Sequence, residues 1–182
     1  MNLTEKPVSQ EYIYNGKIIS LRVDQILLPN EKPAIREVIE HPGGVCVAAI
    51  TESDEILLVR QFRYPYMEEI LEIPAGKKER GEDPLTCGMR ELKEETGATA
   101  KNFFSLGKLY PTPGYCGETI HLYGATELSF GDDNPDDDEF LECIKLPFEK
   151  VVQMIISGEI KDAKTQTAVL KLDAMRSRGL IK

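Results

Sequence analysis

GEDPLTCGMRELKEETG, residues 81–97, carries the signals of a helix at both ends. Asp83 is a good N-cap and Pro84 a good first helical residue. Gly97 is well placed to end the helix, because glycine accepts the left-handed backbone conformation at low cost. We therefore predict a helix of about four turns between Asp83 and Gly97.

The predicted helix combines an apolar stripe with a group of carboxylates. At about 100° per residue, the stripe that we expect to pack on a sheet consists of Leu85, Met89, Leu92 and the methyl group of Thr96. Glu91 and Glu95 fall one above the other on its flank, and Glu94 lies further round. Their like charges repel, so the group fits either a solvated helix face or a site for Mg²⁺ or Mn²⁺, which prefer carboxylate oxygens.

Composition points to a globular protein with one main domain and an appended element. The 182 residues are 41% hydrophobic and 29% charged, and their net charge of −9 argues against broad attachment to nucleic acid or to a membrane surface. The four cysteines form no C-x-x-C pair, which favours unpaired thiols in a reducing compartment. Neither a signal-peptide pattern nor a bilayer-length apolar run is present, so we expect a cytoplasmic protein.

Residues 1–42 are predicted to form a small antiparallel β subdomain, and residues 43–182 the main domain. Turn signals at Asn15-Gly16, which suits a tight hairpin, and at Pro29-Asn30 divide the first region into strands. In the main domain, GGVCVAAI (43–50) reads as a buried strand and EILLVRQF (55–62) as its hairpin neighbour. The remaining predicted elements are strands at 118–128 and 142–147 and helices at 148–160 and 167–179.

The spacing before and within the predicted helix resembles the box of the Nudix hydrolase family. The chain gives Gly76, five residues, Glu82, seven residues and then RELKEETGA, residues 90–98. This resembles G-x5-E-x7-R-E-U-x-E-E-x-G-U, with U apolar, at every fixed position, and the small Ala98 is the only mild departure. The resemblance implies an α/β fold, namely a Nudix-type α/β/α sandwich with a mixed sheet, preceded by the antiparallel β subdomain. It also implies Mg²⁺-dependent hydrolysis of a nucleoside diphosphate linked to another group, with Mn²⁺ as the alternative metal.

The resemblance also implies roles for particular residues. The implied metal ligands are the carboxylates of Glu91, Glu94 and Glu95 and the backbone carbonyl of Ala75. Arg90 would orient the glutamates, and Glu82 would support the loop. For the general base, a box glutamate (Glu94 or Glu95) and Glu139, at the end of an acidic turn beyond the box, both stay open. Whether Glu72 reaches the metals stays open as well.

Stretches outside the box look like the ADP-ribose pyrophosphatase subgroup. They are AIREVIEHPGG (34–44), LLVRQFRYP (57–65), LEIPAG (71–76), YPTPGYCGE (110–118) and DDDEF (136–140). Such enzymes split ADP-ribose into AMP and ribose 5-phosphate, and they form homodimers that exchange N-terminal strands. On this resemblance, Arg36 and Glu37 would reach the adenosine half, Arg63 the diphosphate and Glu118 the terminal ribose. The alternatives are salt bridges for the two arginines and a plain loop position for Glu118.

Two other functions remain in view. The box handles only diphosphate and metal, so it does not separate ADP-ribose from GDP-mannose or another sugar nucleotide, a dinucleoside polyphosphate, or NADH. A Nudix domain that senses a ligand without cleaving it is the remoter alternative, and an intact box argues against it. The expected partners are thus a small nucleoside diphosphate substrate and a second copy of the chain, without nucleic acid or membrane.

Overall fold

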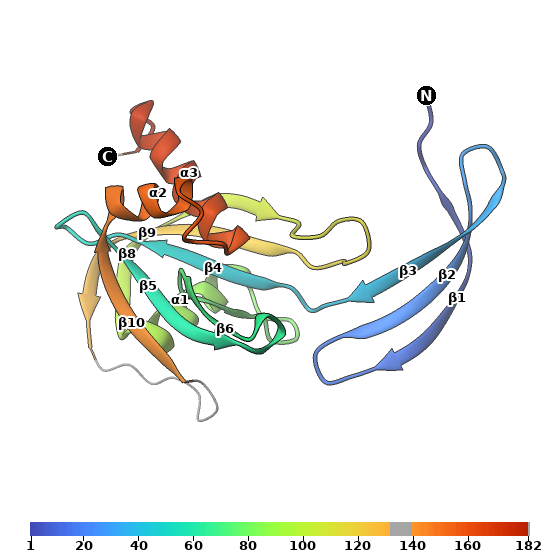
Figure 1. Ribbon diagram of the computed structural model, residues 1–182, viewed down its shortest axis with the longest axis horizontal. Helices are drawn as coiled ribbons and strands as arrows, with labels where there is room; N and C mark the ends of the chain where they lie inside the picture. Colours follow the sequence, from blue (N-terminus) through green and yellow to red (C-terminus); the bar gives the residue numbers. More distant parts are fainter. Residues whose placement is uncertain (132–139, 182) are drawn as a thin grey trace. The chain divides into compact units, whose positions relative to one another are not determined.

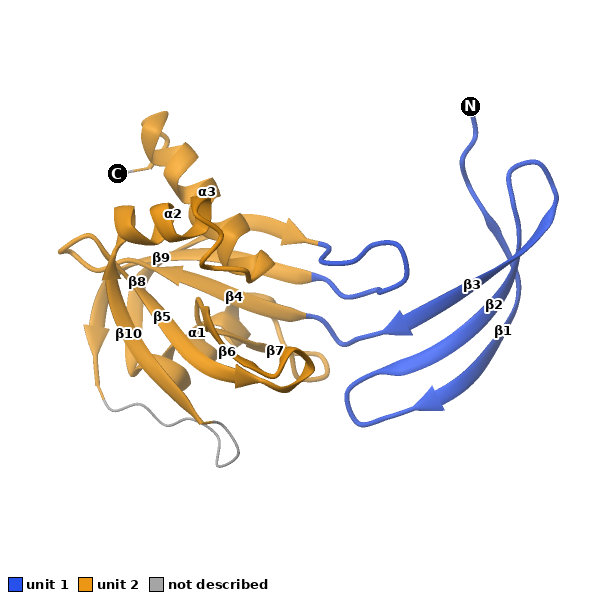
Figure 2. Ribbon diagram, in the orientation of Figure 1, with its two compact units in different colours: residues 1–43, 110–119 blue, residues 44–109, 120–182 orange. Residues whose placement is uncertain are grey.

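The computed structural model describes residues 1–131 and 140–181 (Figure 1). The chain divides into two compact units, one made of residues 1–43 and 110–119 and the other of residues 44–109 and 120–182 (Figure 2). The smaller unit thus combines the N-terminal region with a distant loop, residues 110–119, which contains Pro113 and Gly114. The role of residues 1–42 in dimerisation stays a prediction.

The smaller unit is built on a three-stranded antiparallel sheet. Its strands are β1 (Lys6–Asn15), β2 (Ser20–Leu27) and β3 (Pro33–Glu40), in that order. The first turn covers residues 16–19 and is closed by Gly16, whose N–H donates to the Ile19 carbonyl over 2.9 Å, so it is longer than a turn at Asn15-Gly16 alone. The loop 110–119 joins this unit because Ile39 donates to the Tyr115 carbonyl and accepts from Gly117.

The larger unit contains two further sheets. Its strands are β4 (Gly44–Ala49), β5 (Glu55–Arg63), β6 (Glu68–Glu72), β7 (Ala75–Lys77), β8 (Ala98–Leu109), β9 (Ile120–Phe130) and β10 (Leu141–Pro147). A mixed sheet has the order β7-β4-β9-β8, in which β4 and β9 run parallel, and an antiparallel sheet has the order β10-β5-β6. The prediction that β5 is the hairpin neighbour of β4 is therefore wrong. Both edges of β4 are already taken by β7 and β9, and a bridge between Ile50 and Ile56 links the two strand ends.

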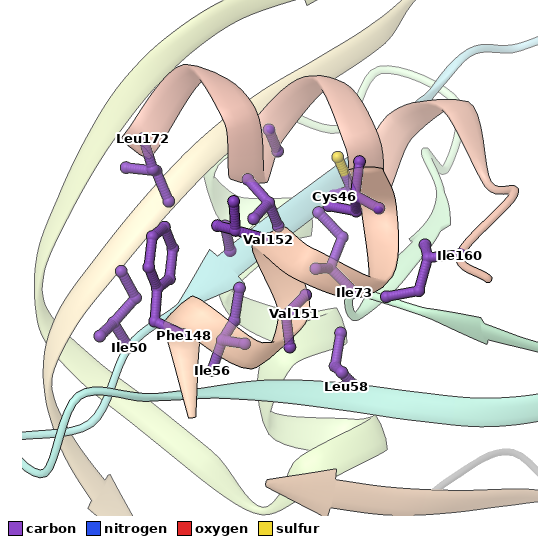
Figure 3. Packing of buried hydrophobic residues seen from close by; sticks show 14 of the residues in the cluster. Cys46, Ile50, Ile56, Leu58, Ile73, Phe148, Val151, Val152, Ile160 and Leu172 are labelled. Atoms are coloured by element: carbon purple, nitrogen blue, oxygen red, sulfur yellow. The ribbon is translucent and has the colours of Figure 1, made fainter. Parts of the chain in front are cut away.

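Helices cover the strands of this unit on two faces. They are α1 (Pro84–Thr96), α2 (Phe148–Ile156) and α3 (Ala163–Ser177), and a short 3₁₀ helix, η1, spans Tyr64–Tyr66. Because side chains alternate along a strand, Cys46 and Ala48 of β4 pack with residues of α2 and α3, as does Ile50 directly after the strand, whereas Val47 and Ala49 pack with Leu92 of α1. Figure 3 shows Cys46 and Ile50 in the first of these clusters. The predicted α/β/α sandwich with a mixed sheet is confirmed. In the described part of the chain, every helix is too short or too polar to cross a bilayer.

Helix α1 begins and ends where the sequence predicts, but it is rotated about its axis. The Asp83 carboxylate accepts from the N–H groups of Leu85 and Thr86, and Gly97 has φ 67°. The predicted stripe is partly wrong, since Leu85 and Met89 are 38% and 47% exposed. The buried face of the helix consists of Cys87, Gly88, Glu91, Leu92, Glu95 and Thr96. The helix therefore turns two carboxylates inward at the expense of two apolar side chains.

Gly88 explains how α1 sits so close to the sheet. A Cβ at this position would be in ordinary van der Waals contact, 3.4 Å from Val47 Cγ2 and 3.5 Å from the Tyr123 ring. An alanine would therefore still fit, whereas a side chain that extends beyond Cβ would push the helix outward and carry Glu91 and Glu95 away from β7.

Candidate active site

The carboxylate of Glu91 lies against the backbone of β7. A Cβ added to Gly76 would stand 1.9 Å from Glu91 Cδ, so any side chain at position 76 would expel the carboxylate. Glu91 is 7% exposed. The first glycine of the box therefore leaves room for the carboxylate of a glutamate that lies 15 residues later in the same motif.

Glu95 lies one helical turn from Glu91 and binds Ala75, the residue that precedes Gly76 in β7. Its Oε2 accepts a hydrogen bond from the Ala75 N–H over 2.9 Å, and the residue is 2% exposed. The Pro74 carbonyl accepts from Val47 of β4, also over 2.9 Å. Residues 74–76 are thus fixed between β4 and α1, and the structure brings three of the predicted metal ligands together: Ala75, Glu91 and Glu95.

Arg90 contacts three carboxylates of the box. Its Nε donates to Glu82 over 3.1 Å, its Nη1 to Glu94 over 2.8 Å, and its Nη2 lies 2.9 Å from Glu91. The hydrogen bond to Glu82 is the main cause that raises the pKa of Arg90 above its ordinary value. The same bond lowers the pKa of Glu82 to about 2. Both groups therefore stay charged throughout the physiological range.

A neighbour of this arrangement that the sequence did not single out is Cys87. Its Sγ lies 3.4 Å from Arg90 Nη2 and 3.6 Å from the Lys77 carbonyl. Burial is the main cause that raises the pKa of this thiol to about 12. Cys87 is thus a neutral packing partner of the arginine, and only its position within the motif could have indicated this contact.

The charge and chemistry of these groups suit a hard divalent cation. Arg90 supplies one positive charge to three carboxylates, and all the predicted ligand atoms are oxygens, which Mg²⁺ and Mn²⁺ prefer. Within residues 1–131 and 140–181, however, no three acidic, histidine or cysteine side chains already form a metal-binding group. Glu91 and Glu94 are held by Arg90 instead, so cation binding would require these carboxylates to turn from the guanidinium toward the ion.

A second charged cluster lies at the end of β6, the strand that precedes β7 in the chain. Glu72 is 1% exposed and accepts from Arg63 through Nε (2.6 Å) and Nη2 (2.9 Å), and also from Lys164. Burial alone would raise the pKa of Glu72, but the two cations together lower it. The salt-bridge alternative for Arg63 is thus present in the structure, although its side chain remains 38% exposed. Sequence reasoning missed Lys164, which is 92 residues away from Glu72.

The other predicted substrate-binding residues belong to the smaller unit. Arg36 of β3 forms an ion pair with Glu5, and Glu37 is exposed on the same strand. Glu118 lies 3.3 Å from Nδ1 of His41, a residue that the sequence did not single out. These three belong to the smaller unit, whereas Arg63 and the box belong to the larger one. Glu139 lies outside the described residues.

Comparison with known proteins gives matches over nearly the whole chain. The NUDIX domain family matches residues 23–167, and the family described as nucleoside diphosphate sugar hydrolase N-terminal domain matches residues 5–39. An ADP-ribose pyrophosphatase of Bacillus subtilis is 42% identical over 170 residues, which cover 92% of each chain. A methanol dehydrogenase activator of Bacillus methanolicus is 42% identical over 167 residues, covering 91% of this chain and 90% of that one.

The fold has a counterpart among solved structures. The crystal structure of an ADP compounds hydrolase superposes with a TM-score of 0.84 over 100% of both chains, at 20% identity, which speaks for the fold alone. The family match includes every residue of the box described above, from Gly76 to Ala98. On these grounds the chain belongs to the NUDIX domain family.

Proposed function

We propose that the chain hydrolyses the diphosphate bond of ADP-ribose to AMP and ribose 5-phosphate in the presence of Mg²⁺. The observation that carries the proposal is the inward face of α1, where Glu91 and Glu95 are packed onto residues 75 and 76. A helix turned for stability alone would bury Leu85 and Met89 and expose its carboxylates. Family membership makes the chain a hydrolase of phosphoanhydride bonds.

Glu91, Glu94, Glu95 and the Ala75 carbonyl would hold the cation, with Mn²⁺ as an alternative to Mg²⁺. Such a cation would neutralise the diphosphate, align it and activate a water molecule for attack at phosphorus. The hydrogen bond from the Ala75 N–H fixes Oε2 of Glu95 beside the backbone of the residue whose carbonyl is the fourth proposed ligand. Gly76 leaves the space that the Glu91 carboxylate occupies.

The proton from the attacking water requires a base, and two kinds of carboxylate compete for this role. Glu94 and Glu95 belong to the box, and Arg90 orients Glu94 through the 2.8 Å hydrogen bond. Glu139 is the candidate beyond the box. A base must come within hydrogen-bond reach of the water in the substrate complex, so substitution of each carboxylate decides between them.

Substrate recognition would use four further residues. Arg63, whose side chain is 38% exposed, would contact the diphosphate. Arg36 and Glu37 would bind the adenosine half and Glu118 the terminal ribose. We also propose a homodimer that exchanges N-terminal strands. Every residue of β1 is exposed in the single chain, including the apolar Val8, Tyr12, Ile13 and Tyr14, and apolar surface of this kind favours association. A solution mass equal to one chain would contradict the dimer.

The cytoplasm is the proposed location. The described part of the chain contains no disulfide, and Cys46 and Cys87 are buried thiols. Persistent free thiols are typical of a reducing compartment.

A sugar nucleotide such as GDP-mannose is the second candidate substrate, favoured by the match of residues 5–39 to the N-terminal domain of nucleoside diphosphate sugar hydrolases. A substrate panel with Mg²⁺ separates the candidates: ADP-ribose, GDP-mannose, NADH and diadenosine polyphosphates, with the products identified by chromatography. We expect the highest kcat/KM for ADP-ribose. A kcat/KM for ADP-ribose no higher than for the other compounds would overturn the substrate assignment, and no cleavage of any compound would overturn the enzymatic function.

A further inference from the structure

Two helices bind the backbone of residues 73–75. Helix α1 accepts a hydrogen bond from Ala75 through Glu95, and the N-terminal end of α3 accepts one from Ile73. The Ile73 N–H donates to Thr165 Oγ1 over 2.9 Å, and Thr165 is fully buried. Thr165 in turn donates from its hydroxyl and its N–H to Asp162 Oδ2, over 2.6 Å and 2.9 Å. Asp162 therefore caps the helix and orients the hydroxyl that fixes Ile73, only two residues before a predicted metal ligand.

Lys164 connects this helix end to the cluster around Arg63. Its Nζ donates to Glu72 and, over 2.9 Å, to Asp162 Oδ1, and its side chain is only 12% exposed. The cluster of Arg63, Glu72, Asp162 and Lys164 thus contains two cations and two anions. Without Lys164 it would carry a net negative charge, in a place where burial weakens the screening by water.

The orientation of Arg63 depends on Glu72. The Glu72 carboxylate takes the Nε and Nη2 edge of the guanidinium in a two-bond contact, which fixes the plane of the group. Glu72 cannot leave this position, because it is buried and also bound to Lys164. Since Lys164 balances part of the Glu72 charge, the positive charge of Arg63 is not fully offset by its own partner.

We propose that Lys164 is a positioning residue for substrate binding, which keeps Glu72 in place and partly neutralised so that Arg63 presents its charge to the substrate diphosphate. The inference rests on the proposed function, in which Arg63 contacts the diphosphate. It predicts an effect on substrate binding that a purely structural lysine would not have.

The experiment compares steady-state kinetics of full-length wild type with K164M, K164R and K161M. K164M removes the charge and keeps much of the apolar stem, and its KM for ADP-ribose should rise about tenfold while kcat changes less than about threefold, since a lost charge-assisted contact of this kind is worth about one factor of ten in binding. K164R should keep KM within about threefold of wild type. The increase in KM should shrink as NaCl is added, because salt screens the uncompensated charge.

K161M is the matched control for the loss of a lysine in the same segment. Lys161 pairs with Glu68 over 3.0 Å at the surface, its side chain being 64% exposed. Its loss should leave both KM and kcat at wild-type values. If K164M and K161M behave alike, the charge of Lys164 has no special relation to the substrate.

Other outcomes of the experiment also test the role of Lys164. A K164M enzyme with a lower melting temperature but an unchanged KM would overturn the inference and make Lys164 a stabilising residue. If K164M does not fold, K164Q replaces it, because the amide keeps a hydrogen-bond donor to Glu72 without the charge, and the same rise in KM is expected. Failure of both neutral variants to fold, beside a K164R enzyme with wild-type KM, would likewise show a role in stability alone. Absence of any turnover by wild type would overturn the proposed function and the inference with it, whereas an active wild type with an unaltered K164M overturns the inference only.

Discussion

The Glu91 carboxylate occupies the space that a side chain at Gly76 would need, with Glu91 Cδ 1.9 Å from the position of that Cβ. This steric relationship ties the loop before α1 to a predicted metal ligand. The G76A variant should therefore displace Glu91 and lower kcat/KM about a hundredfold or more, since a displacement of about 1 Å at a reacting centre can cost that much. G131A is the matched control, because its added methyl would meet only the Gly97 carbonyl at 4.0 Å. Wild-type kinetics in G76A would show that the position of Glu91 is unimportant.

Glu95 permits a test of charge without a change of shape. In E95Q the side-chain carbonyl can still accept from the Ala75 N–H, so circular dichroism and the melting temperature should stay close to wild type. Loss of the anionic ligand should nevertheless lower kcat by about two orders of magnitude. An E95Q enzyme with full activity would remove Glu95 from the set of metal ligands.

The general base can be assigned by comparing E139Q with E94Q. If Glu139 is the base, E139Q should lower kcat by about two orders of magnitude or more and abolish the acidic limb of the pH–rate profile. KM and the dependence on Mg²⁺ should then stay unchanged. A near-normal rate in E139Q, with the loss appearing in E94Q, would place the base within the box.

The ion pair between Glu82 and Arg90 predicts how stability depends on pH. Hydrogen bonding to Arg90 lowers the pKa of Glu82 from an ordinary value of 4.5 to about 2. Because the folded state has the lower pKa, the pair contributes fully above about pH 4.5, and this contribution is lost as the pH falls toward 2. The melting temperature of wild type should therefore fall more steeply than that of E82Q between about pH 5 and about pH 3. Parallel curves for the two proteins would contradict this role, and E52Q, on an exposed turn, should follow wild type.

Local signals in the sequence predicted the limits of α1 and the identity of the box correctly. Asp83 and Gly97 act through hydrogen bonds and backbone conformations within a few residues, so the helix ends can be read directly from the chain. The rotation of the helix could not be read in this way. An apolar pattern predicts burial of Leu85 and Met89, whereas the contact between Gly76 and Glu91 and the small Gly88 determine which face meets the sheet.

Contacts between distant parts of the chain could not be predicted from the sequence. The pairing of β5 with β10 rather than with β4 joins segments some 80 residues apart, and no local pattern in either strand indicates its partner. Lys164 and Glu72 are separated by 92 residues. An Asp-Ala-Lys sequence at a helix start predicts a cap at Asp162, but it gives no indication of which buried carboxylate the lysine meets.

Metal-dependent cleavage of ADP-ribose can be measured by incubating the purified protein with ADP-ribose and Mg²⁺, and then with excess EDTA. With Mg²⁺ the products should be AMP and ribose 5-phosphate in equal amounts, and EDTA should reduce their formation to background, since the inward carboxylates of α1 need a cation to act on a diphosphate. Unchanged ADP-ribose in the presence of Mg²⁺, or equal turnover with EDTA, would contradict the proposed function.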